Sequence, residues 1–387
     1  MIMSMRLKKL LALSLSVSLV STGIFIDVGM RNVTAAVSKT KQTKEKNVKK
    51  VKATVEQKKT IKAPKSEKKA VWSIVSGQQN ISVIKKDKGE IKIKAQKSGN
   101  VKLQAKQGKK KTIYNITVKK QAPKKSEIKQ LTKFYKECFI KSSKEMGNNW
   151  YADGDDFLHD KWIEWDDYGY IRGMSLEAKE ILTEINLPRF KKIQYFGSVT
   201  GNNLKSIDLG NNPTLKYFFL DVGYGESAEE GNYPYLNKID FSGCQNLEGV
   251  YINSVFNIKQ IDLSNNRKIK TVNISHTPLD ELKMPKTDCL KEVYMNWSKI
   301  NELDLSNCTN IQKIGIIGCN PQSVTISLGN KTDKEISEFD IDVYSADVET
   351  SVRFVANREI SEVPKVRYEY GYLGYIDGGL DFLRNCI

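Results

Sequence analysis

An apolar residue recurs at intervals of 10 or 11 residues, with one interval of 21, through the middle of the chain. Each recurrence opens the phrase Leu/Ile-x-x-apolar-x-apolar, which predicts a short strand after a bend. The recurring residues are Leu204, Leu215, Leu236, Leu247, Ile258, Ile269, Leu279, Leu290, Ile300 and Ile311. A fixed period of this kind predicts coils that stack as a solenoid, because one coil alone cannot bury its apolar side chains. Function is therefore expected on a surface.

The repeat is clearest in residues 204–213 (LKSIDLGNNP), 258–266 (IKQIDLSNN) and 300–309 (INELDLSNCT). These stretches resemble the leucine-rich repeats of bacterial surface proteins. Two half-repeats alternate every 21 to 22 residues, which is similar to the internalin-type subset, where both sides of a coil carry strand-like segments. The resemblance covers about 150 residues and implies a strand-rich α/β solenoid with few helices, but no particular ligand.

The outward residues of the repeat strands form two rows that differ in chemistry. One row, the Asp row, contains Asp208, Asp240, Asp262, Lys283 and Asp304. The other, the aromatic row, contains Phe219, Tyr251, Asn273, Tyr294 and Gly315. In the general repeat pattern the Asp row belongs to the concave strand, whereas the internalin-type pattern places it on the convex side. The short spacing from Phe190 to Leu204 agrees with the second pattern, so we expect the aromatic row on the concave face.

Aromatic residues in such a row have two interpretations. They favour strands and help neighbouring coils to stack. They also suit a binding platform, because flat amphipathic rings supply contact area at low entropic cost. On the second interpretation, the candidate ligand-binding residues are Phe219, Tyr251, Asn253, Asn273, Tyr294, Asn296 and Trp297.

The first 35 residues have the layout of a secretory signal peptide. Arg6, Lys8 and Lys9 precede an apolar stretch at residues 10–26, and the small-residue sequence VTAA follows at residues 33–36. The stretch is also near the lower length limit for an uncleaved membrane anchor. Its serines favour cleavage near Ala36 and hence export to the surface or surroundings of a Gram-positive bacterium.

Charge is divided unequally along the chain. Residues 38–125 contain 28 Lys and 5 acidic residues, whereas residues 126–387 contain 30 basic and 39 acidic residues. A basic segment outside a cell is attracted to anionic polymers or lipids, so residues 38–125 are expected to associate with the anionic cell envelope rather than with nucleic acid. For residues 38–60 a solvated, self-repelling linker is the alternative.

Short alternating segments separated by glycines predict a small all-β sandwich over residues 51–120. Residues 72–73 (WS), 95–105 (AQKSGNVKLQA) and 114–118 (YNITV) resemble the bacterial Ig-like domain, group 2. That family implies spacers and adhesive stalks of surface proteins, and it has no common catalytic site.

Six cysteines are too few for a disulfide-built scaffold in a chain of 387 residues. Cys244, Cys308 and Cys319 stand three residues after the last apolar residue of a strand, as Asn212 and Asn266 do in sister repeats. This is the Asn-or-Cys position of leucine-rich repeats. We therefore expect structural cysteines rather than catalytic or metal-binding ones.

The predicted organisation has six parts. These are a signal peptide (1–35), a Lys-rich linker (36–50), an Ig-like domain (51–120), a linker and N-terminal cap (121–170), leucine-rich repeats (171–320) and a β-rich C-terminal cap (321–387). A helical pattern over 121–147 and a Trp-rich segment at 162–165 belong to the N-terminal cap.

Catalytic motifs are absent from the sequence. Its two histidines, His159 and His276, lie in no nucleophile motif. Asp153, Asp155 and Glu164 have the spacing of calcium-loop positions, but Phe157 and Leu158 replace the required ligand and glycine. We expect a non-catalytic adhesion protein that binds a protein or glycan and uses no metal, cofactor or small-molecule substrate. The alternative is an exported hydrolase or peptidase with an unrecognised C-terminal site.

Overall fold

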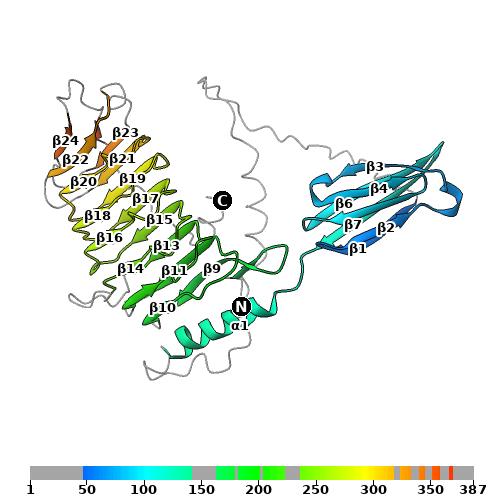
Figure 1. Cartoon of the computed structure of the whole chain (residues 1–387), viewed down its shortest axis with the longest axis horizontal. Helices are drawn as coiled ribbons and strands as arrows, with labels where there is room; N and C mark the ends of the chain where they lie inside the picture. The colour runs from blue at the N-terminus through cyan, green and yellow to red at the C-terminus, as the bar shows by residue number, and fades with distance from the viewer. Residues whose placement is uncertain are drawn as a thin grey trace, which may run out of the picture. The chain divides into compact units, whose positions relative to one another are not determined.

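The computed structural model describes residues 47–141, 163–178, 182–200, 204–222, 236–317, 323–332, 340–344, 351–357 and 366–368 (Figure 1). This part is rich in strands and contains few helices. The helical elements are α1 (Lys125–Tyr135), a π-helical turn at Lys136–Ile140 and 3-10 turns at Lys65–Glu67 and Gln78–Asn80. No helix in the described ranges has the length and apolar character needed to cross a membrane.

Seven strands form the N-terminal β unit, residues 48–119. Sheet A has the order β1 (Val48–Thr54), β7 (Lys110–Lys119), β6 (Gly99–Gln107), β3 (Val71–Ser76), and sheet B has the order β2 (Lys58–Lys62), β5 (Glu90–Ala95), β4 (Ile81–Asp87). β1 pairs with β7 in parallel, and the other pairs are antiparallel. The alternating segments that predicted strands over residues 51–120 are confirmed as strands.

Both sheets contribute to one apolar core, which includes Trp72, Ile93, Leu103 and Ile116. The rings of Trp72 and Tyr114 lie 5.1 Å apart. Because β1 begins at Val48, the expected linker over 36–50 extends too far. Alternate residues of this edge strand are lysines, and only small side chains such as Ala53 face the core, so the apolar pattern is weak.

Helix α1 confirms the helical pattern within residues 125–141 and begins four residues later than expected. Lys124, which follows Pro123, has extended backbone angles, so the helix begins at Lys125. Leu131, Phe134 and Cys138 join the core of the following region. The buried carboxylate of Glu127 accepts N–H bonds from Ile171 (3.3 Å) and Lys191 (3.4 Å), which fixes the helix to this core.

The repeat region, residues 171–368, passes alternately through strands of a large sheet and a series of short sheets. The ten-stranded sheet has the order β25 (Val366–Tyr368), β23 (Asp340–Tyr344), β21 (Lys313–Ile317), β19 (Glu292–Asn296), β17 (Thr271–Ser275), β15 (Gly249–Asn253), β13 (Tyr217–Asp221), β11 (Tyr195–Thr200), β9 (Ile171–Ala178), β8 (Ile163–Trp165). All neighbours are parallel except β8 and β9.

The short strands lie between those of the large sheet in the sequence. They are β10 (Glu184–Asn186), β12 (Ser206–Asp208), β14 (Ile239–Asp240), β16 (Gln260–Asp262), β18 (Glu281–Lys283), β20 (Glu302–Asp304), β22 (Ser323–Gly329) and β24 (Ser351–Ala356). They form parallel sets β10-β12-β14, β16-β18 and β20-β22-β24. The predicted strand in each half-repeat is thus confirmed.

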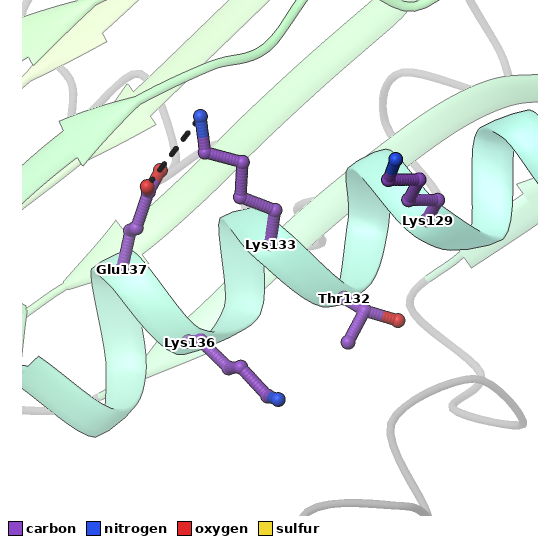
Figure 2. Close-up of a pocket in the computed structure, with 5 residues that line it drawn as sticks. All are labelled: Lys129, Thr132, Lys133, Lys136 and Glu137. Carbon is purple, nitrogen blue, oxygen red and sulfur yellow. Dashed lines mark ion pairs between the residues drawn. The ribbon is translucent and has the colours of Figure 1, made fainter.

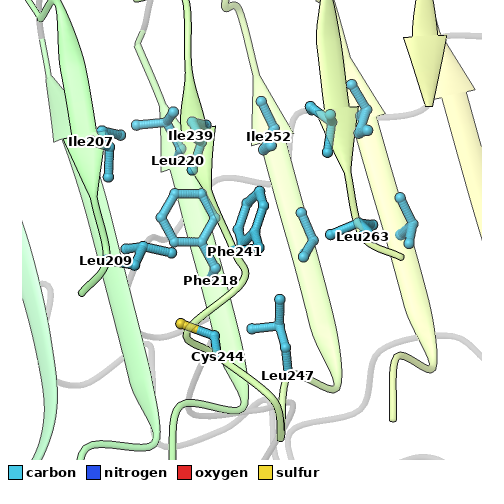
Figure 3. Close-up of a cluster of buried hydrophobic side chains, with 14 of the residues drawn as sticks. Ile207, Leu209, Phe218, Leu220, Ile239, Phe241, Cys244, Leu247, Ile252 and Leu263 are labelled. Atoms are coloured by element: carbon cyan, nitrogen blue, oxygen red, sulfur yellow. The ribbon is translucent and has the colours of Figure 1, made fainter. Parts of the chain in front are cut away.

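Apolar side chains from both kinds of strand fill the space between the sheets (Figure 3). Phe218 of β13 meets Phe241, just after β14, edge to face at 5.2 Å between ring centroids. Ile207, Leu220 and Ile252 lie beside them in the same layer. Stacking of coils therefore removes from water the side chains that opened the repeat phrase.

Both kinds of sheet continue past residue 320, where a β-rich C-terminal cap was expected. β23 and β25 extend the ten-stranded sheet in parallel, and β22 and β24 continue the short sheets. The 11-residue phrase is lost here because the connections change in length. Alternating apolar residues such as Val324 and Ile326, both fully buried, still suffice to continue the stack.

Candidate binding surface

The candidate ligand-binding residues lie on the outward face of the ten-stranded sheet. Backbone pairing places Phe219, Tyr251, Asn273, Tyr294 and Gly315 side by side in one row across five strands. A neighbouring row contains Asp221, Asn253, Ser275 and Asn296. Neighbouring strands of a sheet are about 4.8 Å apart, so successive residues of one row lie at about this spacing. The fold therefore brings the sequence-predicted residues of these rows together.

Phe219 is a correction to the predicted set. Its position in the row is outward, but only 4% of the residue is exposed, so it contributes to packing rather than to an accessible surface. Tyr251 and Tyr294, by contrast, are half-buried. The accessible aromatic part of the row therefore begins at Tyr251.

Glycines on adjacent positions accommodate the tyrosine rings. A Cβ added to Gly315 would come within 2.5 Å of Tyr294 Cδ1, and one added to Gly249 would come within 3.0 Å of Tyr251 Cε2. Lys313 places its ammonium 5.6 Å from the centroid of the Tyr294 ring. The Tyr294 ring thus lies against the neighbouring strand β21, which supports the stacking interpretation for one side of this ring, whereas the Tyr251 ring lies beside Gly249 of its own strand.

Trp297 follows β19 directly and is the most exposed aromatic of the predicted set, at 45%. Its indole stacks on the imidazole of His276, with 6.0 Å between centroids and 13° between planes. Ser254, His276 and Trp297 occupy equivalent positions after successive strands, and all three have positive φ of 49° to 58°. This left-handed backbone is uncommon for a tryptophan, so the surrounding structure must hold Trp297 in it.

A chain of polar contacts leads to this ring pair. Asn253 donates from Nδ2 to the Asp221 carboxylate at 3.2 Å, and His276 Nδ1 lies 3.2 Å from Asn253 Oδ1. Because a carboxylate only accepts, the Asn253 amide must direct its NH2 group to Asp221 and its oxygen to His276. His276 Nδ1 therefore carries the hydrogen. The sequence gives one sign of the His276–Trp297 pair: each residue directly follows an outward strand of the repeat.

Burial lowers the pKa of His276 below 6.5, and the Asp221 charge opposes this shift. The neutral imidazole is thus the dominant form at neutral pH. A neutral ring under the indole gives a flat surface without a net charge at its centre.

The three predicted asparagines have different places. Asn253 belongs to the polar chain, and Asn273 accepts a 3.0 Å hydrogen bond from the Ser275 hydroxyl through Oδ1. The backbone of Asn296 completes β19, and its side chain lies outside the described residues.

The Asp row has a local structural role on the short strands. Each of Asp208, Asp240, Asp262 and Asp304 accepts the backbone N–H two residues ahead, at 2.7 to 2.9 Å. Hydrogen bonds from the side chain and backbone of Ser242 lower the pKa of Asp240, and those of Ser264 lower that of Asp262. These carboxylates make the turn that follows each strand.

The Asn-or-Cys positions are fully buried at Asn212, Cys244, Asn266 and Cys308. Asn266 donates to the carbonyl oxygens of Phe241 (3.1 Å) and Cys244 (2.9 Å) in the preceding coil. Burial raises the pKa of the Cys244 thiol to about 12 and that of Cys308 to about 11, which suppresses the reactive thiolate. Cys319 lies outside the described residues.

Lys331 takes the corresponding place in the next coil, which sequence reasoning missed. The residue is 6% exposed, and its ammonium donates to the carbonyl oxygens of Leu305 (3.3 Å) and Cys308 (2.6 Å). A lysine ammonium thus makes the contacts that an asparagine amide makes elsewhere.

A shallow depression on α1 is lined by Lys129, Thr132, Lys133, Lys136 and Glu137 (Figure 2). Lys133 and Glu137 form an ion pair at 3.6 Å between successive turns. All lining residues belong to one helix and its continuation, so the depression encloses no volume in which chemistry would be shielded from water.

Within the described ranges, no group of three or more His, Cys, Asp or Glu residues could hold a metal ion. Glu164 lies in β8 and pairs with Arg172 at 3.2 Å. Residues 153–160 of the calcium-like spacing and His159 lie outside the described residues. Comparison of the chain with family models, curated proteins and solved structures finds no match.

Proposed function

We propose that the chain is an exported, non-catalytic binding protein with a leucine-rich repeat solenoid and a bacterial Ig-like domain. The alternation of parallel strands between two sheets supports the solenoid, as does the buried column that contains Asn212, Cys244, Asn266 and Cys308. The two sheets around Trp72 support the Ig-like part. Recognition of a protein or glycan is assigned to the accessible part of the aromatic row and to Trp297.

One observation carries this assignment: Trp297 is an exposed indole whose direction is fixed. Its stacking on His276 restricts the ring before any partner arrives. A ring that is already ordered loses little entropy on binding, and tryptophan is among the residues that contribute most to interfaces. Tyr294, on the same strand, adds a second aromatic surface.

Binding to partners on a glycan array and to proteins from a surface extract tests the proposal. For a partner identified with the wild-type chain, Trp297→Ala is expected to weaken binding by at least about 30-fold, equivalent to about 2 kcal/mol. The matched control is Lys283→Ala, an exposed residue on β18. Equal affinity of wild type and Trp297→Ala, with Lys283→Ala reduced, would place the site on the short-strand side.

Association of the Lys-rich segment with the cell envelope is the second part of the proposal. The strands of the N-terminal β unit carry many lysines and few carboxylates, and such attraction weakens with salt because screening shortens to about 3 Å at 1 M. Washing cells with concentrated salt should release the protein. Retention in salt with release only by wall-digesting enzymes would refute an electrostatic attachment.

A further inference from the structure

The two sheets of the N-terminal β unit differ sharply in charge. The strands of sheet A contain no acidic residue. Register and alternation with the buried core place six lysines on its outward face, and this set forms the lysine face: Lys50, Lys52, Lys102, Lys106, Lys111 and Lys119.

Three of the seven lysines on the strands of sheet B form ion pairs with carboxylates. Lys62 pairs with Glu90 at 3.5 Å, Lys85 with Asp87 at 2.7 Å, and Lys94 with Glu56 at 2.6 Å. These exposed pairs contribute little to stability, but they place a negative charge beside each positive one. The positive potential is therefore expected to be concentrated over sheet A.

The residues between the lysines of sheet A indicate the kind of partner. Asn100, Gln104, Asn115 and Thr117 lie on the same outward face, and three of them are exposed. These side chains offer hydrogen bonds and no apolar group that would insert into a bilayer. The exposed aliphatic residues of this face, Val48 and Val71, lie singly on the two opposite edge strands, β1 and β3, so they form no continuous apolar patch.

The spacing of the lysine face suits a linear chain of charges. Lys50 and Lys52 are two positions apart on β1, a separation of about 7 Å. Lys50 and Lys102 both pair with Asn115, from opposite sides, so about 10 Å separates their backbones. An extended polymer with one negative charge per repeat unit would meet several lysines at once, within about one screening length of each other at physiological salt.

We propose that the lysine face of sheet A binds a linear phosphodiester polymer. This inference rests on the proposed envelope association and names the surface and the ligand chemistry. Phosphate oxygens accept from lysine ammonium groups, and the intervening amides and hydroxyls hydrogen-bond to the polymer backbone. Binding releases counterions, so the affinity falls steeply as salt rises.

The test compares two full-length variants with equal loss of charge. The sheet A variant carries Gln in place of Lys50, Lys52, Lys106 and Lys119. The sheet B variant carries Gln in place of Lys58, Lys62, Lys85 and Lys92. The probe is immobilised poly(glycerol phosphate) at several salt concentrations. The sheet A variant is expected to bind at least tenfold more weakly, with a salt slope smaller by roughly 0.7 for each phosphate that it no longer neutralises. The sheet B variant should bind within about threefold of wild type, because its lysines lie outside the lysine face.

Equal losses in both variants would overturn the assignment, because net charge alone would then explain binding. Preference of the wild type for phosphatidylglycerol vesicles over the polymer would also overturn it and identify lipid headgroups as the anion source. All eight lysines are exposed, so both variants should keep the wild-type Tm. The salt wash of cells tests the envelope association separately. If salt releases the wild type from cells but the sheet A variant binds the polymer as well as wild type does, the lysine face is not the binding surface, and the envelope association stands. If the wild type does not associate with cells even at low salt, the envelope proposal itself is refuted.

Discussion

The Asp row and the aromatic row lie on alternating strands of the same coils, but the fold uses them differently. In the Asp row four of the five residues are aspartate, because each of these carboxylates accepts the N–H that begins the next turn. In the aromatic row the residue changes from Tyr251 to Asn273 to Tyr294 while the backbone pairing stays the same.

This contrast separates two causes of a sequence pattern. A residue type that most coils repeat, as aspartate does in all but the Lys283 coil, serves the backbone of the coil. Where the type varies and the strand geometry does not, the backbone imposes no such requirement, and the side chains are available for recognition. The acidic row, although more regular, is therefore the weaker candidate for a ligand site.

The largest effect should come from the core that both rows share. Leu263 is fully buried, so Leu263→Ala is expected to lower the free energy of unfolding by about 2 to 5 kcal/mol. The outward, half-buried Tyr294→Ala should cost less than half of the value measured for Leu263→Ala. Denaturant unfolding of both variants checks the order. An equal or larger loss for Tyr294→Ala would make the aromatic row primarily structural.

The buried column beside the Asp row should give the next effect. Asn266→Ala removes two hydrogen bonds and leaves the Phe241 and Cys244 carbonyl oxygens without this donor, at an expected cost of about 1 to 3 kcal/mol. Asn266→Cys should cost less, because Cys occupies this position in sister coils. The two variants are compared by denaturant unfolding, and a larger loss for Cys than for Ala would contradict the interchangeability of the two residue types.

A smaller, pH-dependent effect is expected in the Asp row itself. Hydrogen bonds from the Ser264 hydroxyl and backbone lower the pKa of Asp262, so its contribution to stability is present above the unfolded pKa of about 3.9 and is lost as pH falls through the folded value. Asp262→Ala should therefore be less stable than wild type at pH 7, by about 0.5 to 2 kcal/mol if the turn resembles a helix cap. The difference should shrink below about pH 4. A gap that is independent of pH would show that the charge is unimportant.

This result also matters for testing the ligand site. Charge reversal of Asp240 or Asp262 would break the turns and perturb the fold. Such variants would therefore be poor controls for binding. Lys283→Ala is the better control because it lies in the same row and is not one of the turn-forming aspartates.

Periodicity predicted most of the strand-rich fold, because the spacing of apolar residues such as Leu263 and Ile274 is imposed directly by the coils. The predicted outward row was also correct in register, since alternation along a strand determines which residues share a face. Exposure was not predictable in this way. Phe219 is buried in a row where Tyr251 is half-buried, and exposure depends on surroundings that strand alternation does not specify.

The extension beyond residue 320 and the His276–Trp297 pair were missed for related reasons. Parallel pairing depends on backbone geometry, so β23 and β25 join the sheet without the 11-residue phrase. The ring pair depends on positive φ at His276 and Trp297, a conformation that is uncommon for residues other than glycine and that the apolar pattern does not indicate. The sequence signal that could have revealed the pair is that His276 and Trp297 each directly follow one of two successive strands of the large sheet.

The smallest effect concerns this ring pair and reports on the aromatic side alone. In the fold, burial lowers the pKa of His276, so protonation of the unfolded chain reduces stability as pH falls below about 6.5, whereas above that pH the group makes no difference. Trp297→Ala should uncover the ring and raise the pKa toward 6.5. Asp221→Asn should instead lower the pKa further, because the Asp221 charge favours the protonated form.

Proton NMR titration of the imidazole measures both shifts, and a His159→Gln background leaves His276 as the single histidine. Lys283→Ala on the short-strand side is the matched control and should leave the pKa unchanged. Opposite shifts in the two variants would establish that the indole covers the imidazole and that Asp221 acts on it through its charge. If Trp297→Ala leaves the pKa unchanged, the indole does not shield His276, and the fixed direction that makes Trp297 a binding residue loses its support.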